Sequence, residues 1–119
     1  ALNIEDAIIL EKEAIDLGMD VLIETHTCEE VKMANKLKSK LVGVNNRNLK
    51  TMEVDTNNTL RLKKFIDPDK ILVAESGLKT HLDLQWLKEN GIINFLIGES
   101  LMREKDLTLA TKKILGITN

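Results

Sequence analysis

The sequence predicts an α/β fold in which parallel strands alternate with helices. Four short, continuously apolar runs divide the chain, and the stretches between them have apolar residues at helical spacing. Continuous apolar runs are typical of parallel strands that are buried on both faces. The runs begin at residues 21, 41, 71 and 95, so successive starts are 20, 30 and 24 residues apart. These separations suit right-handed βαβ crossovers.

The expected strands follow the bounds of the apolar runs. They are Val21–Ile23, Leu41–Val44, Ile71–Ala74 and Phe95–Ile97. A helix is expected before the first strand, because Asn3 is a favourable N-cap residue and Gly18 suits a left-handed C-terminal position. Its apolar residues recur on one face, which is expected to point inward. They are Ala7, Leu10, Ala14 and Leu17.

Clear helix signals follow the first and third strands. Thr27 with Glu30, and Thr80 with Asp83, have the spacing of a capping box at the start of a helix. The helix after Thr80 is expected to stop at Asn90-Gly91, and apolar residues within 31–37 form a stripe in the helix after Thr27.

Two more helices complete the alternation. Asp55 is expected to cap a helix that runs through Leu62–Ile66, and Asp67-Pro68 is expected to end it, because the residue before proline disfavours helix. A last helix is expected over 107–115. No glycine-rich or proline-rich linker interrupts the chain, so a single domain over 1–119 is expected.

Composition excludes several classes of function. Of the 119 residues, 17 are Lys or Arg and 19 are Asp or Glu, so the net charge is −2 and a nucleic-acid partner is not expected. A single cysteine excludes an intrachain disulfide and a cysteine-based zinc site. Apolar runs are far shorter than the roughly 20 residues that span a membrane. With no signal-peptide pattern, we expect a cytoplasmic protein without a membrane partner.

Two architectures accommodate four such units. One is a small open doubly wound sheet, and the other is half of a (β/α)8 barrel, whose usual length of ~250 residues is about twice this chain. In both, chemistry lies just beyond the carboxyl ends of the strands. The polar residues expected on that rim are Glu24-Thr25-His26, Asn45-Asn46-Arg47, Glu75-Ser76-Gly77 and Gly98-Glu99-Ser100.

Two carboxylates on this rim are candidates for acid–base chemistry. Glu24 and Glu75 each follow a buried strand, and two carboxylates in one apolar opening perturb each other's proton affinity. The alternative is that each is a solvated surface residue. His26 is expected either to orient a substrate or to pack at the start of the next helix.

The remaining rim residues favour an anionic ligand. Arg47 beside Asn45-Asn46 indicates a polar clamp, although asparagine also suits a simple turn. Ser76-Gly77 and Gly98-Glu99 are expected to be tight turns that aim backbone N–H groups at an anion, with glycine allowing the backbone to approach a phosphate. A phosphate site on the last two strand loops recurs in eight-stranded barrels.

These strand ends resemble those of indole-3-glycerol phosphate synthase, from its fifth to its eighth strand. The matching segments are Leu22–Thr27, Gly43–Thr51 with Glu53–Asp55, Ala74–Gly77 and Leu96–Arg103. Their order and spacing agree over essentially the whole chain. One departure is Asn48, where the family usually has Asp, and this exchange is expected to weaken a local turn or salt bridge.

The resemblance implies the carboxyl-terminal half of a (β/α)8 barrel enzyme, a carboxy-lyase of tryptophan biosynthesis. The family closes the indole ring of 1-(2-carboxyphenylamino)-1-deoxyribulose 5-phosphate, with loss of carbon dioxide and water. It uses neither a metal nor an organic cofactor. By resemblance, Glu24 is the general acid–base carboxylate, and Asn45 and Glu75 hold the substrate and the intermediate.

The resemblance also implies which residues bind the phosphorylated substrate. Arg47 is expected to fix it on the phosphate side, and Ser76 is expected to contact a substrate hydroxyl. The phosphate site is expected to be lined by Gly77, Gly98 and the backbone of Glu99.

The first four βα units of the family have no counterpart in this chain. They carry two lysines and a further glutamate, and those lysines bind charged groups of the substrate and donate the proton that drives ring closure. Lys50 and Lys79 match neither motif. The chain is therefore expected to be the carboxyl-terminal half-barrel, starting at the fourth helix, with which Ala1 as first residue agrees. Because the lysines are missing, it is expected to be inactive by itself.

A half-barrel has unpaired edge strands and an uncovered apolar face. We therefore expect a homo-oligomer or pairing with an amino-terminal half-barrel. The alternative function is a non-catalytic, phosphate-binding half-barrel fragment that self-associates. A different phosphate-binding barrel, such as phosphoribosylanthranilate isomerase, is disfavoured by Asn45-Asn46-Arg47.

Overall fold

The structure, a computed structural model, describes residues 3–117 and confirms the α/β fold. One parallel sheet has the strand order β1-β2-β3-β4, with the bounds Leu22–Thr25, Leu41–Asn45, Ile71–Glu75 and Phe95–Leu96. The helices are α1 (Ile4–Asp16), α2 (Cys28–Ala34), α3 (Asn57–Lys63), α4 (His81–Glu89), α5 (Glu99–Met102) and α6 (Leu107–Leu115). Every strand is followed by a helix, so the chain provides half of the eight units of a (β/α)8 barrel.

The register divides the strand residues between two faces of the sheet. Glu24 pairs with Gly43, and Asn45 pairs with Glu75, which pairs with Leu96. Because side chains alternate along a strand, these five residues belong to one face. The residues between them in sequence belong to the other face.

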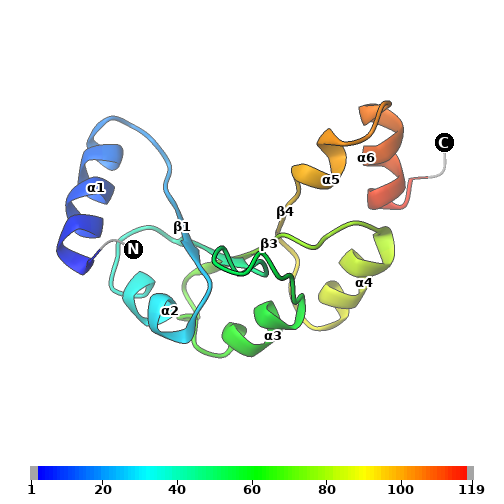
Figure 1. Ribbon diagram of the computed structural model, residues 1–119. Coiled ribbons are helices and arrows are strands. Elements are labelled where there is room, and N and C mark those ends of the chain that lie inside the picture. The colour runs from blue at the N-terminus through cyan, green and yellow to red at the C-terminus, as the bar shows by residue number, and fades with distance from the viewer. Residues whose placement is uncertain (1–2, 118–119) are drawn as a thin grey trace.

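Helices cover only one of these two faces (Figure 1). Helices α2, α3 and α4 pack along the face that carries Val44 and Ala74, both fully buried. A fully buried side chain of this kind contributes about 1.5–3 kcal/mol. Within residues 3–117 no helix covers the opposite face, where Leu22, Ile71 and Leu96 are 38%, 44% and 50% exposed. The fold is therefore stabilised from the helical side, and the other face stays open.

Most of the predicted helix ends are confirmed. The side chain of Asn3 accepts from the backbone N of Asp6 at 2.8 Å, and Gly18 has φ +78° after α1. Thr27 and Thr80 each cap a helix, and both capping boxes are complete. The stop at Asn90-Gly91 is also confirmed, since Asn90 is the C-cap of α4.

Other expectations about the elements were wrong. Helix α3 begins at Asn57 and ends at Lys63, so Phe65 and Ile66 lie beyond it. Asp55 is not the N-cap; its carboxylate accepts from the backbone N of Asn57 at 2.9 Å, in a turn before the helix. Helix α5 was not predicted, because four residues are too few for a helical apolar period.

Helix α1 also packs differently from the prediction. Leu10 and Leu17 of its apolar stripe are 52% and 74% exposed, because α1 stands at the edge of the sheet (Figure 1). Glu11 is the one buried residue of α1. No helix among the described residues has the length and apolar character needed to cross a membrane.

Candidate active site

One open cavity of about 730 Å³ lies at the carboxyl ends of the four strands. Its wall contains all but one of the predicted site residues: Glu24, Asn45, Arg47, Glu75, Ser76, Gly77 and Gly98. Glu99 directly follows Gly98 as the first residue of α5. The strand ends therefore bring together residues that are up to 74 positions apart, as between Glu24 and Gly98.

Asn45 is the centre of a hydrogen-bonded chain in this wall. Its Nδ2 donates to Glu24 Oε1 at 2.7 Å, and its Oδ1 accepts from Ser76 Oγ at 2.8 Å. The same Oδ1 accepts from the backbone N of Arg47 at 2.9 Å. Asn45 is buried, and these partners fix the orientation of its amide. The amide thereby links the exposed carboxylate of Glu24 to the loop after β3.

Glu75 is the buried acid of the cavity. It is 6% exposed, and its Oε2 is buried without a hydrogen-bond partner among the described residues. Burial, and to a smaller extent the negative charge of Glu24, raises the pKa of Glu75 to about 7. A carboxyl group with this pKa can hold or release a proton near neutral pH.

Glycine at position 43 makes room for this buried acid. A Cβ atom at Gly43 would lie 2.1 Å from Glu75 Oε2 and 2.9 Å from Glu75 Cδ. Residue 43 lies in the central strand β2, next to β3, with its open side on the cavity face. The missing side chain therefore determines where the carboxyl group of Glu75 lies.

The loop after β3 is the tight turn that the sequence predicts. Ser76 has φ +69° and Gly77 has φ +75°, both in the left-handed region. A Cβ atom at Gly77 would lie 2.6 Å from Val54 Cγ1, so the loop packs closely against the segment that follows β2. Ser76 is held in this conformation although it carries a Cβ atom.

Comparison with known proteins identifies the family of the chain. A sequence profile of indole-3-glycerol phosphate synthase matches residues 1–114. The chain belongs to the indole-3-glycerol phosphate synthase family. It is 45% identical over 109 residues to a relative of that name from Acinetobacter baylyi, covering 91% of this chain and 41% of the relative. It is 47% identical over 116 residues to the one from Azospirillum brasilense, covering 98% of this chain and 44% of the relative.

The match is confined to one part of these synthases. The Magnetococcus marinus relative is 48% identical over 107 residues, covering 90% of this chain and 40% of the relative. The chain thus spans about two fifths of the length of the curated relatives it matches, and the matched part is their carboxyl-terminal part. This coverage agrees with the four βα units of the structure.

Two more residues at the strand ends stand in different relations to the cavity. Gly98 lies directly before α5, and its carbonyl accepts from Met102 N at 2.9 Å. A Cβ atom at Gly98 would meet nothing within 4 Å. His26 lies directly before Thr27, the N-cap of α2; its Nδ1–H donates to the carbonyl of Asn45 at the end of β2 at 2.7 Å, and it is not part of the cavity wall.

Asn46 and Asn48 follow β2 but lie outside the cavity wall. Neither has a left-handed backbone, and Asn46 is 1% exposed with its side chain outside the cavity wall. Asn48, the departure from the family pattern, holds its turn itself: its Oδ1 accepts from the backbone N of Lys50 at 2.9 Å and of Thr51 at 3.3 Å. With Asn where the family usually has Asp, this turn is therefore still hydrogen-bonded.

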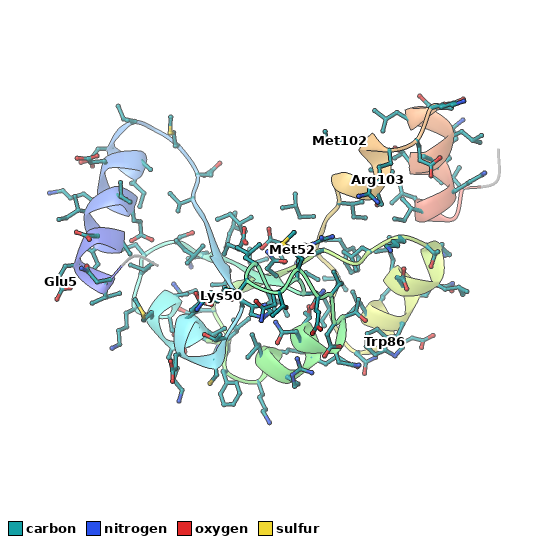
Figure 2. The ribbon with its side chains drawn as sticks, in the orientation of Figure 1. Glu5, Lys50, Met52, Trp86, Met102 and Arg103 are labelled. Carbon is teal, nitrogen blue, oxygen red and sulfur yellow. The ribbon has the colours of Figure 1, made fainter. Side chains whose placement is uncertain are left out.

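Sequence reasoning missed three polar residues of the cavity wall. Lys79, Arg103 and Glu104 line it together with the predicted residues, and Ser100, which was expected on the rim, lines it too. Figure 2 shows Arg103 just after α5, on the arm of the chain that rises from β4. Met102 beside it is 83% exposed. The sequence position of the missed residues could have indicated them, because each lies within a few residues of a strand-end turn.

Proposed function

We propose that this chain supplies the carboxyl-terminal half of an indole-3-glycerol phosphate synthase. The reaction closes the indole ring of 1-(2-carboxyphenylamino)-1-deoxyribulose 5-phosphate, releases carbon dioxide and water, and belongs to tryptophan biosynthesis. One observation carries the proposal: Glu24, Asn45 and Ser76 form one hydrogen-bonded chain beside the protonatable Glu75, all in a single cavity. Membership of the family supports it.

The two carboxyl groups differ in the way that acid–base chemistry requires. Glu24 is exposed in the cavity and accepts a hydrogen bond from Asn45. Glu75 is buried, and its pKa of about 7 leaves it partly protonated at neutral pH. Loss of water from the ring-closed intermediate needs a proton for the departing hydroxyl group and a base for a proton of the substrate. We assign Glu24 as the general acid–base residue, and Asn45 and Glu75 as groups that hold the substrate and the intermediate.

The loops that line the cavity suit the phosphate group. Gly77 and Gly98 lie in the loops after β3 and β4, and Arg47 and Ser76 line the same cavity. We assign Arg47 to the phosphate side of the substrate, Ser76 to a substrate hydroxyl, and Gly77, Gly98 and the backbone of Glu99 to the phosphate. A guanidinium group and backbone N–H groups are the usual partners of such an anion.

Charge counting indicates that the site is incomplete without further βα units. The described wall holds three cationic side chains, Arg47, Lys79 and Arg103, against three carboxyl groups, those of Glu24, Glu75 and Glu104. The substrate carries both a carboxylate and a phosphate, so more positive charge is needed. We propose that the first four βα units of the family supply it through their two lysines, and that this chain alone has no substantial activity.

Reconstitution tests the proposal. The chain is co-expressed with the amino-terminal segment of the Azospirillum brasilense synthase that it does not match, and the release of indole-3-glycerol phosphate is followed by fluorescence. Turnover is expected from the pair and not from either part alone. Glu24→Gln is expected to lower kcat by about 100-fold or more, because it removes a general acid–base group. Glu89→Gln, an exposed change at the end of α4, is the matched control.

A positive control makes a negative result decisive. The two segments of the Azospirillum brasilense synthase itself are co-expressed in the same way. If they turn over the substrate while the pair containing this chain does not, the proposed function is wrong. A non-catalytic, phosphate-binding half-barrel then becomes the better account.

A further inference from the structure

Asn46 lies outside the cavity, yet every polar atom of its side chain is bonded within the fold. It follows β2 and is 1% exposed, on the face that the helices cover. Its Oδ1 accepts from the backbone N of Thr59 at 3.1 Å and from Thr59 Oγ1 at 2.7 Å. Thr59 belongs to α3 and is fully buried. These two donors fix the orientation of the amide, so Nδ2 is directed to the loop after β3.

The loop that receives this bond has an unfavourable backbone conformation. Asn46 Nδ2 donates to the carbonyl of Ser76 at 3.1 Å, and the backbone N of Asn46 donates to the carbonyl of Glu75 at 2.9 Å. Ser76 and Gly77 are consecutive left-handed residues. Unlike glycine, serine carries a Cβ atom, which is sterically crowded in that region. Two hydrogen bonds from one residue to consecutive carbonyls offset that cost and hold the loop.

From Ser76 the hydrogen bonds continue into the proposed active site. Ser76 Oγ donates to Asn45 Oδ1 at 2.8 Å, and Asn45 Nδ2 donates to Glu24 Oε1 at 2.7 Å. Ser76 and Gly77 also line the cavity, where Ser76 is assigned to a substrate hydroxyl and Gly77 to the phosphate. A displacement of Ser76 therefore changes the wall first and the orientation of Asn45 second.

We propose that Asn46 is a positioning residue for substrate binding. From the helical face of the sheet it holds the Ser76–Gly77 loop in the left-handed conformation that binds the phosphorylated end of the substrate. The inference rests on the proposed function and adds to it a residue that touches no substrate. Asparagine is required because the position needs an acceptor for Thr59 and a donor for Ser76 on one planar group. Aspartate keeps the shape and the acceptor but has no donor.

The test compares Asn46→Asp with the wild-type chain in the reconstituted pair. Loss of the hydrogen bond to Ser76 is expected to raise KM for the phosphorylated substrate by about tenfold. The Kd for inorganic phosphate, measured by titration calorimetry, is expected to rise by a similar factor. The kcat value is expected to fall less than KM rises, because Asn46 contacts no reacting atom.

Thr59→Val is the matched control in the same buried cluster. It removes the Oγ1 donor to Asn46 but leaves the backbone donor and the bond between Asn46 and Ser76. KM and the phosphate Kd are expected to stay within about twofold of wild type, even where the thermal midpoint falls. A second comparison uses Ser76→Gly. Glycine adopts a positive φ without help, so Asn46→Asp is expected to raise the phosphate Kd less in that background.

Each outcome decides the inference. It is overturned if folded Asn46→Asp binds phosphate and substrate as wild type does, or if Thr59→Val raises KM equally, which indicates a merely structural role. If Asn46→Asp does not fold, Asn46→Ser, which is too short to reach Ser76, is read in the same way. A wild-type pair that binds phosphate without forming product refutes the proposed function but still allows the phosphate comparison. A wild-type pair that binds no phosphate refutes both.

Discussion

Glu75 shows how a single residue couples the chemistry of this site to stability. Its carboxyl group is buried beside Glu24, and its pKa is raised from 4.5 to about 7. Between these values the folded protein binds more protons than the unfolded chain, so the free energy of unfolding falls as pH rises through this range. Below about pH 4.5 the group imposes no such cost, because it is protonated in both states.

Replacing Glu75 with glutamine is therefore expected to stabilise the protein at high pH. Glu75→Gln keeps the shape and removes the ionisation, so it is expected to gain up to about 2 kcal/mol over wild type at about pH 8 and much less at about pH 5. Urea unfolding at both pH values measures the difference, with the exposed Glu89→Gln as control. An equal effect at both pH values would show that Glu75 does not titrate in this range.

The missing side chain at Gly43 is expected to matter more for activity than for folding. In Gly43→Ala the new Cβ atom lies on the carboxyl end of Glu75, a flexible group that can move into the cavity. We expect the free energy of unfolding to fall by about 1 kcal/mol, and kcat of the reconstituted pair to fall about tenfold or more. Double-mutant analysis with Glu75→Ala checks the cause: the stability cost of Gly43→Ala should vanish in that background. A cost that persists would implicate another contact.

Sequence reasoning predicted the cavity residues better than their neighbours. Glu24, Asn45, Glu75 and Ser76 were predictable because polar residues directly after buried strands converge on one rim. Asn46 was not assigned correctly, because residue type alone does not tell which of two successive asparagines faces the opening. Strand alternation settles that point only once the strand end is known.

Helix α1 shows how one contact at the scale of an element replaces a packed face. The carboxylate of Glu11 accepts from the backbone N of Lys38 at 2.8 Å and of Ser39 at 2.7 Å. Apolar residues of α1 such as Ile9 and Leu10 remain more than half exposed. Glu11 therefore attaches α1 to the loop before β2, and the apolar residues of α1 form an exposed surface of the kind that other proteins bury.

Removing this contact is expected to release α1. Glu11→Ala leaves two backbone N–H groups without their acceptor, which costs about 1–3 kcal/mol locally. Hydrogen exchange of the α1 amides is expected to accelerate, with little change in the amides of β2 and β3. Glu13→Ala, an exposed change in the same helix, is the matched control. If exchange in α1 is unchanged, Glu11 does not hold the helix.

Element boundaries were predictable where side chains cap the backbone. The capping boxes at Thr27 and Thr80 fixed the starts of α2 and α4, because their hydrogen bonds depend only on local sequence. Helix α3 was misplaced because Asp55 forms its bond to Asn57 within a turn, and the same residue type serves both purposes. Local sequence cannot separate these two uses.

At the scale of the whole molecule, both edges of the sheet are unpaired. The position of α1 restricts which second half-barrel can close the barrel. In a (β/α)8 barrel each helix covers the junction between two neighbouring strands. Helix α1 stands beyond β1 and α6 beyond β4, at opposite edges of the sheet (Figure 1). If a second copy closed the barrel, the α6 of one copy and the α1 of the other would meet at the same junction. An amino-terminal half whose chain ends in a strand brings no helix to that junction, so α1 can cover it.

We therefore expect an equimolar pair with an amino-terminal half-barrel rather than a dimer of this chain. Deleting residues 1–19 removes α1 and is expected to increase self-association, because α6 of a second copy can then cover β1. Sedimentation velocity of the intact and shortened chains measures this directly. An intact chain that dimerises as tightly as the shortened one would argue for the self-associating half-barrel.

The alternation of side chains along β2 and β3 separates residues that serve reactivity from residues that serve packing. Positions 41, 43, 45, 71, 73 and 75 face the opening, whereas positions 42, 44, 72 and 74 face the helices. A mutagenesis library restricted to the odd positions would therefore vary reactivity while sparing the packed interior. A single-residue insertion within either strand would move the residues beyond it to the opposite faces, so the length of these strands is constrained as well as their composition.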